Sequence, residues 1–202
     1  MARLPVAVLV SGSGTNLQAL IDAAARPTFG AELVVVVSDR PGVAALDRAR
    51  NAGIPVEVVA WEEHPDRAAF TVAVCDAAAR HGAEALVLAG FMRILGPEAI
   101  ARYPNRIVNV HPSLLPAFPG ARAVAQSLAY GVKVSGATVH FVDEEVDHGP
   151  IISQEPVPVL PDDDEATLHR RIQAVEHRLL PEAVDALAAG RLTIQGRSVR
   201  WS

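Results

Sequence analysis

The sequence has few features that would cross-link the chain covalently or anchor it to a membrane. One cysteine, Cys75, among 202 residues excludes an internal disulfide framework and is typical of a reducing cytosol. No apolar run approaches the roughly 18 residues that a membrane span requires. The N-terminal apolar run meets glycine and serine too early for a signal peptide. We therefore expect a cytoplasmic protein with no membrane partner.

Basic charge is also scarce. The 18 Lys and Arg residues are outnumbered by 23 Asp and Glu residues, which gives a net charge of −5. Nucleic-acid-binding proteins usually carry a basic surface, so we expect no nucleic-acid partner. Half of the residues are apolar and 20% are charged, which excludes a disordered chain. The length fits a single domain, residues 1–202, and leaves open whether the protein is a monomer or a homodimer.

Short apolar runs alternate with helical patterns in the first half of the chain. Because the helical segments are about ten to fifteen residues long, they predict right-handed βαβ units. The expected fold class is α/β, with a Rossmann-like, mostly parallel twisted sheet and helices on both faces. The expected strands are residues 5–10, 33–37, 56–59, 86–89 and 107–110, and the expected helices are residues 16–25, a segment ending at Gly53, 66–81 and 97–102.

The second half has a different pattern. A proline-rich loop leads into a helix that ends at Tyr130, and strands are expected at residues 137–142 and 151–159. A long helix follows at residues 166–189, in which Pro181 predicts a kink or a break. A hairpin of residues 192–194 and 198–201, on either side of a glycine, is expected to close the chain. In such sheets ligands bind beyond the carboxyl ends of the strands. The candidate loops therefore begin at Ser11, Ser38, Gly90, His111 and Asp143.

The first of these loops is rich in glycine. Residues 12–16 (GSGTN) lie between a strand and a helix start, where backbone amides and the helix dipole favour an anion. Thr15 or Asn16 can cap the helix and donate hydrogen bonds. The segment lacks the third glycine of a dinucleotide fingerprint and the Gly-Lys-Ser/Thr of a P-loop. We favour phosphate binding over a turn that merely needs small residues.

Polar residues also follow the strand at residues 107–110. Strand alternation places Asn109 and His111 on one face, where an amide and an imidazole suit a developing oxyanion. Taken alone, each is more readily explained as a residue that anchors the loop. The acidic loop 143–149 is by default a solvated charge run. A turn before Gly149 and a proline could instead bring Asp147 beside His111, which would raise the pKa of the imidazole.

Other chemistries have weaker support. His111, His140, Asp147 and His148 could bind a metal, but none shows a HExxH or CxxC spacing. Cys75 lies in an apolar helical stretch and is expected to be a buried small side chain, not a nucleophile. Ser113 lacks the Gly-x-Ser-x-Gly pattern of serine hydrolases. We therefore expect no metal.

Five motifs together resemble the phosphoribosylglycinamide formyltransferase family, which performs the third step of purine synthesis. The likeness runs in order from Val6 to Trp201 and is very specific as a set, although HPSLLP and the Asp-x-Gly loop are shared with other formyltetrahydrofolate enzymes. The motifs are residues 11–16 (SGSGTN), 88–95 (LAGFMRIL), 109–116 (NVHPSLLP), 136–142 (GATVHFV) and 146–149 (VDHG).

The resemblance implies roles for individual residues. It implies that 10-formyltetrahydrofolate is the cosubstrate, that glycinamide ribonucleotide accepts the formyl group, and that no metal is needed. The implied catalytic residues are Asn109, His111 and Asp147; those that bind the ribonucleotide are Gly14, Thr15, Asn16, Gln173 and Glu176; and those that bind the folate are Arg67, Met92, Arg93, Ile94, Leu95, Asn109, Asp143, Val146 and Asp147. The family usually has a histidine in the helix after Gly120, whereas residues 121–126 (ARAVAQ) contain none.

Three other functions compete with this one. Methionyl-tRNA formyltransferases usually add a C-terminal nucleic-acid-binding domain, and formyltetrahydrofolate deformylases an N-terminal regulatory domain. Neither extension is expected in 202 residues, and the acidic charge disfavours tRNA. A binding module that keeps the fold but not the catalysis is opposed only by the intact set Asn109, His111 and Asp147.

Overall fold

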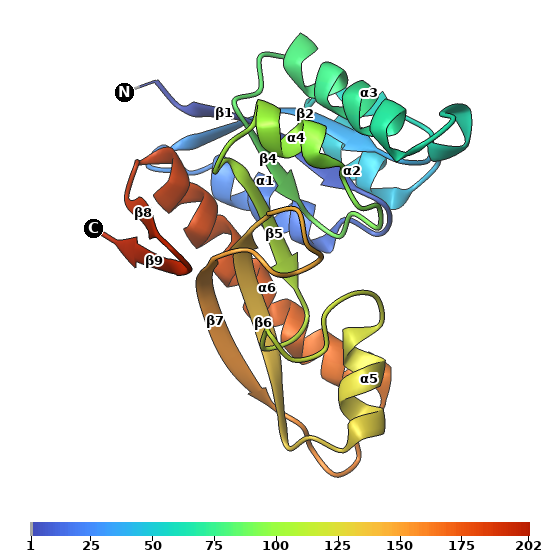
Figure 1. Ribbon diagram of the computed structural model, residues 1–202, viewed down its shortest axis with the longest axis vertical. Coiled ribbons are helices and arrows are strands. Elements are labelled where there is room, and N and C mark those ends of the chain that lie inside the picture. The colour runs from blue at the N-terminus through green and yellow to red at the C-terminus, as the bar shows by residue number, and fades with distance from the viewer. Residues whose placement is uncertain (1) are drawn as a thin grey trace.

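The computed structural model describes residues 2–202 and is built on one nine-stranded sheet (Figure 1). The strand order is β3-β2-β1-β4-β5-β6-β7-β9-β8. The strands are β1 (Leu4–Val10), β2 (Ala31–Ser38), β3 (Val56–Val58), β4 (Ala85–Leu88), β5 (Ile107–His111), β6 (Val134–Phe141), β7 (Ile151–Pro158), β8 (Leu192–Gln195) and β9 (Ser198–Trp201). The helices are α1 (Thr15–Ala24), α2 (Ala44–Asn51), the 3₁₀ turn η1 (Trp61–Glu63), α3 (Arg67–Arg80), α4 (Pro97–Arg102), α5 (Ala123–Tyr130) and α6 (Glu165–Ala188).

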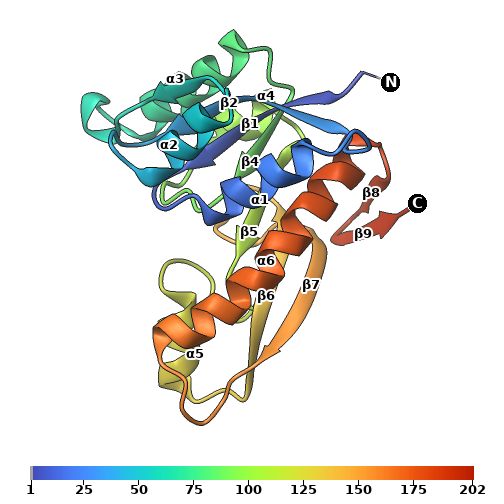
Figure 2. The same cartoon turned by 180° about the vertical axis from the view of Figure 1, so that it is seen from behind.

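Apolar side chains from both faces of the sheet are buried. In β1, Val6, Val8 and Val10 belong to one core cluster, while Ala7 and Leu9 belong to the other. The first cluster contains residues of α1, α2, α5 and α6, and the second contains residues of α3 and α4. Figures 1 and 2 show these layers from opposite sides, with α3 and α4 in front in the first and α1 and α6 in front in the second. This arrangement confirms the predicted α/β class with helices on both faces.

The parallel half has the topology that the sequence predicts. Strands β3, β2, β1, β4 and β5 pair in parallel. The strand numbers fall from β3 to β1 and rise from β4 to β5, so the order switches direction between β1 and β4. Ligands of open α/β sheets bind beside such a switch point. The loop after β1 is joined to the loop after β4 there, because the Ser11 N–H donates to the Gly90 carbonyl and the Met92 N–H donates to the Ser11 hydroxyl.

One expectation about the second half is wrong. Since β6 runs antiparallel to β5, with Val108 opposite Phe141, the loop after β6 begins at the amino end of β5 and not at the shared carboxyl edge. The Val142 N–H donates to the Ile107 carbonyl at this level. The loop then folds back, so that Asp147 reaches the carboxyl end of β5.

Helix α6 runs unbroken from Glu165 to Ala188 through Pro181, so the break that was one of the two predicted alternatives is absent. Its start is fixed by a capping box between Asp164 and Thr167, and the ring of Pro181 is buried. Tertiary packing therefore outweighs the backbone hydrogen bond that proline removes. The 3₁₀ turn η1 was not predicted from the sequence.

The predicted C-terminal hairpin is present and extends the sheet. Its strand β9 lies parallel to β7, with Ser198 opposite Ile151, and the indole N–H of Trp201 donates to the Ile152 carbonyl at 2.9 Å. The hairpin turn is therefore close to the start of β7, where the loop carrying Asp147 ends. In residues 2–202 no helix is both long and apolar enough to cross a membrane.

Candidate active site

A cavity of about 300 Å³ opens between the loops that follow β4, β5 and β6. Asn109, His111 and Asp147, the predicted catalytic residues, all line it. Of the residues predicted to bind folate, the cavity is also lined by Met92, Arg93, Ile94, Leu95, Asp143 and Val146. The fold thus brings two predicted sets together in one space, although their roles stay predictions.

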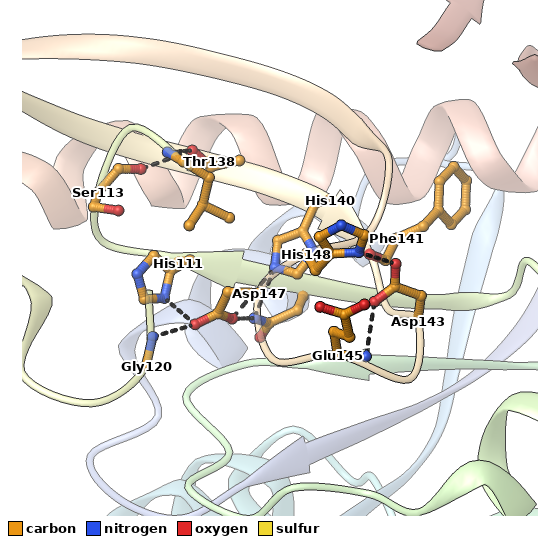
Figure 3. A network of polar contacts seen from close by, with 12 residues as sticks. His111, Ser113, Gly120, Thr138, His140, Phe141, Asp143, Glu145, Asp147 and His148 are labelled. Carbon is orange, nitrogen blue, oxygen red and sulfur yellow. Dashed lines mark hydrogen bonds and ion pairs between the residues drawn. The ribbon is translucent and has the colours of Figure 1, made fainter. Parts of the chain in front are cut away.

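The Asp147 carboxylate lies at the centre of a polar network (Figure 3). Its Oδ2 accepts a 2.7 Å hydrogen bond from the Gly120 N–H and is 3.2 Å from His111 Nδ1. Its Oδ1 accepts from the Asn109 amide at 3.3 Å. Burial favours a raised pKa for Asp147, but the adjacent His140 ring, the nearby charge of His111 and the Gly120 N–H outweigh it, so the pKa is lowered. Asp147 is therefore a carboxylate at neutral pH.

His111 is nearly fully buried, and burial opposes the predicted effect of Asp147 on its pKa. Its Nε2 is 2.8 Å from the Phe118 carbonyl oxygen, and its Nδ1 faces Asp147. Both neighbours favour the charged ring, as expected from the sequence. Burial is the larger effect, however, and it lowers the pKa of His111 below its ordinary value of 6.5. The resting imidazole is neutral at pH 7. Each ring nitrogen faces a hydrogen-bond acceptor, and these two acceptors would stabilise the charged ring if it gained a proton during a reaction.

His140 also belongs to this network, whereas the sequence suggested only a metal-binding role for it. Its Nδ1 is 2.7 Å from the Phe141 carbonyl oxygen and its Nε2 is 3.1 Å from the Asn109 amide nitrogen. A ring that donates through Nδ1 has Nε2 free to accept, so His140 orients the Asn109 amide. The two residues lie directly opposite each other across β5 and β6. Only the antiparallel register shows this pairing, and the sequence does not specify that register.

The glycine-rich loop forms a second part of the site. Gly14 is the N-cap of α1 at φ 71°, and no side chain caps the helix, so the expected capping by Thr15 or Asn16 is wrong. A Cβ at Gly14 would lie 2.7 Å from the Cβ of Ala45, so glycine is required here by conformation and by space. The uncapped amides at the start of α1 keep the capacity to bind an anion.

The residues predicted to bind the ribonucleotide meet between α1 and α6. The Asn16 amide donates to Glu176 Oε2 at 2.9 Å, and the Gln173 amide is 3.4 Å from the Thr15 hydroxyl. Glu176 is 3% exposed, and burial raises the pKa of its carboxyl group, against the lowering effect of the Asn16 hydrogen bond. The Oδ1 of Asn16 is buried and has no hydrogen-bond partner within residues 2–202, so it is available to a ligand N–H.

The two arginines predicted to bind folate differ in their surroundings. Arg93 is held by buried Asp39, with 2.7 Å between Nε and Oδ2, and its guanidinium lies 5.1 Å from the ring centroid of Trp61. Arg67 is exposed at the first turn of α3 and does not line the cavity. Asp39 and Trp61 are further residues near the site that the sequence did not reveal.

The remaining nucleophile and metal hypotheses gain no support. Cys75 is buried as predicted, and burial raises the pKa of its thiol to about 11. The Ser113 hydroxyl donates to the Ala117 carbonyl at 2.6 Å within its own loop. Across residues 2–202, no group of three or more His, Cys, Asp or Glu side chains is arranged to hold a metal ion.

Comparisons with known proteins decide the family. The family model described as "Formyl transferase" matches residues 4–184. A phosphoribosylglycinamide formyltransferase from Mycobacterium tuberculosis is 52% identical over 191 residues, which cover 95% of this chain and 88% of that protein. The chain belongs to the phosphoribosylglycinamide formyltransferase family. It is therefore an enzyme of the formyltransferase class.

Further relatives of the family agree with this assignment. The chain is 46% identical over 192 residues to the trifunctional purine biosynthetic protein adenosine-3 of Gallus gallus, covering 95% of this chain and 19% of that protein. The crystal structure of glycinamide ribonucleotide transformylase 1 from Symbiobacterium toebii superposes with a TM-score of 0.96 at 47% identity, covering 98% of this chain and 94% of that one. These relatives confirm the resemblance found in the sequence.

Proposed function

We propose that the protein transfers the formyl group of 10-formyltetrahydrofolate to the amine of glycinamide ribonucleotide. The products are formylglycinamide ribonucleotide and tetrahydrofolate. The observation that carries the proposal is the convergence of Asn109, His111 and Asp147 on one cavity that six of the other predicted folate residues also line. The apolar side chains of Met92, Ile94 and Val146, which are 66%, 52% and 46% exposed, offer a flat ring system an apolar contact.

The ribonucleotide phosphate is assigned to the uncapped start of α1. Gly14, Thr15 and Asn16 present backbone amides there, and the helix dipole adds positive potential. The link from Ser11 to Gly90 and Met92 joins this loop to the wall of the folate cavity. A nucleotide held at the loop can therefore extend its amine toward a formyl group in the cavity.

The reaction needs a group that accepts a proton and a hydrogen-bond donor that stabilises the negative charge of the oxyanion. As the amine nitrogen attacks the formyl carbon, the carbonyl oxygen becomes an oxyanion and the amine nitrogen must lose a proton. We propose that the Asp147 carboxylate accepts this proton and passes it to neutral His111, 3.2 Å away, whose imidazolium form then helps Asn109 to stabilise the oxyanion. The same proton passes to N10 of the folate when the bond from carbon to N10 breaks. General acid–base catalysis of this kind contributes roughly 10²–10⁴-fold to the rate.

Asn109 is the proposed donor to the oxyanion. The contact of one amide N–H with Asp147 is long, 3.3 Å, so this N–H can be redirected to a developing charge at small cost. His140, 3.1 Å from the same nitrogen, holds the amide group in place. Loss of one oxyanion donor costs roughly 10²–10³-fold in turnover.

A formyl-transfer assay tests the proposal. Purified protein is mixed with 10-formyltetrahydrofolate and glycinamide ribonucleotide, and a second sample lacks the nucleotide. We expect tetrahydrofolate to form only when the nucleotide is present, and His111→Ala to lose turnover while folate binding is largely kept. Folate consumption without the nucleotide would instead indicate a deformylase. No turnover with folate still bound would indicate a binding module.

A further inference from the structure

The C-terminal hairpin contacts the loop that carries Asp147. Arg197, in the turn between β8 and β9, donates through Nη2 to the backbone carbonyl of His148 at 2.6 Å. Its Nη1 lies 2.9 Å from His148 Nε2. The other side of the same imidazole faces the neighbouring carboxylate, with Nδ1 2.8 Å from Asp143 Oδ2 (Figure 3). One guanidinium thus holds both the backbone and the side chain of the residue that follows Asp147.

Asp147 needs such support, because its backbone is in an unfavourable conformation. Its φ of 53° lies in the left-handed region, which costs a residue other than glycine about 1–2 kcal/mol. The chain after it is fixed by Gly149, where a Cβ would lie 1.9 Å from the Phe141 carbonyl oxygen. Before it, the Asp143 carboxylate accepts from the Glu145 N–H at 3.1 Å. The peptide group between His148 and Gly149 is the remaining link, and Arg197 binds its carbonyl.

We infer that Arg197 is a positioning residue for catalysis, which keeps Asp147 directed at His111 by holding the loop 143–149. The inference rests on the proposed function. It assigns a role to a part of the chain that the matched family region, residues 4–184, does not include. The hairpin is well anchored for this task, because Trp201 donates to the Ile152 carbonyl and Ser198 pairs with Ile151.

Arg197→Met tests the inference, since methionine keeps an unbranched apolar side chain and removes the hydrogen bonds. We expect kcat to fall about tenfold, because a small displacement of a catalytic group is costly. The melting temperature and the KM for the ribonucleotide should stay near the wild-type values, because Arg197 is exposed and is not part of the predicted phosphate loop. Arg197→Lys should recover most of kcat, since lysine can donate to the same carbonyl.

Arg200→Met is the matched control, because Arg200 is exposed in the same hairpin and its side chain makes no hydrogen bond or ion pair within residues 2–202.

A second measurement does not depend on turnover. The Gly120 amide donates to Asp147 from a different loop, so its hydrogen exchange reports where the carboxylate lies. We expect Arg197→Met, but not Arg200→Met, to speed this exchange by about fivefold or more. Unchanged exchange at Gly120, an unchanged kcat, or a kcat loss equal to that of Arg200→Met would overturn the inference. An inactive wild-type protein whose Gly120 exchange still responds to Arg197→Met would refute the proposed function and leave the positioning contact standing.

Discussion

At the scale of single residues, burial decides the protonation states of the site. His111 and Glu176 are both buried, and burial favours the neutral form of each, so the imidazole loses affinity for a proton while the carboxyl group gains it. The sequence shows which residue types are present, and strand alternation predicts that Asn109 and His111 share a face. It does not show how deeply a side chain is buried. The predicted effect of Asp147, which raises the pKa of His111, is present, but burial outweighs it and the net pKa is lowered.

The pH dependence of turnover follows from the state of His111. Because the neutral ring accepts the proton, kcat/KM should rise with pH through the lowered pKa of His111, with a midpoint below 6.5. The charge of Asp147 raises that pKa, so Asp147→Asn should move the midpoint to lower pH and cut kcat about a hundredfold. Rate profiles of the two proteins from about pH 5 to 8 measure both effects. A midpoint that moves upward in the variant would contradict the assignment.

Glu176 should make the stability of the protein depend on pH. Its pKa is raised in the folded state, so the folded chain holds the proton more tightly than the unfolded chain. Its contribution to the free energy of unfolding is therefore complete below about 4.5, the ordinary pKa, and is lost as the pH rises through the folded value. Glu176→Gln should remove this slope in urea unfolding between about pH 4.5 and 8. Glu182→Gln, on the exposed side of α6, is the control, and equal slopes in wild type and Glu176→Gln would refute the claim.

At the scale of elements, local rules predicted the first half of the fold well. The expected strands and helices there match β1 to β5 and α1 to α4 to within a few residues. The second half was harder, because the direction of β6 depends on long-range pairing and not on its own sequence. The path of the loop 143–149 and the position of His140 follow from that direction. Of the kink or break predicted at Pro181, the break does not occur, because packing along α6 dominates.

The start of α1 provides a test at this scale. Gly14→Ala must place a methyl group at positive φ and against Ala45, so we expect a loss of about 2–4 kcal/mol in the free energy of unfolding. Gly42→Ala has a similar φ, +69°, but no atom within 4 Å of the new Cβ, and should cost only about 1 kcal/mol. Urea unfolding of both variants separates steric overlap from backbone strain. Equal losses in the two variants would rule out the close contact at Ala45.

At the scale of the whole molecule, the sheet places two candidate binding regions side by side at the switch point between β1 and β4. One is the uncapped start of α1, and the other is the cavity between the loops after β4, β5 and β6. The resemblance in the sequence predicts the residues of both regions, and the fold places the predicted catalytic residues at the cavity. This arrangement predicts that both substrates are bound at once and that the formyl group passes directly between them, with no formyl-enzyme intermediate.

Initial-rate kinetics with both substrates varied test this central claim most directly. Direct transfer in a ternary complex predicts double-reciprocal lines that intersect, because neither product can leave before both substrates have bound. Parallel lines, the pattern of a ping-pong mechanism, would show that the protein itself carries the formyl group between two separate steps. That result would contradict the roles proposed for His111, Asn109 and Asp147.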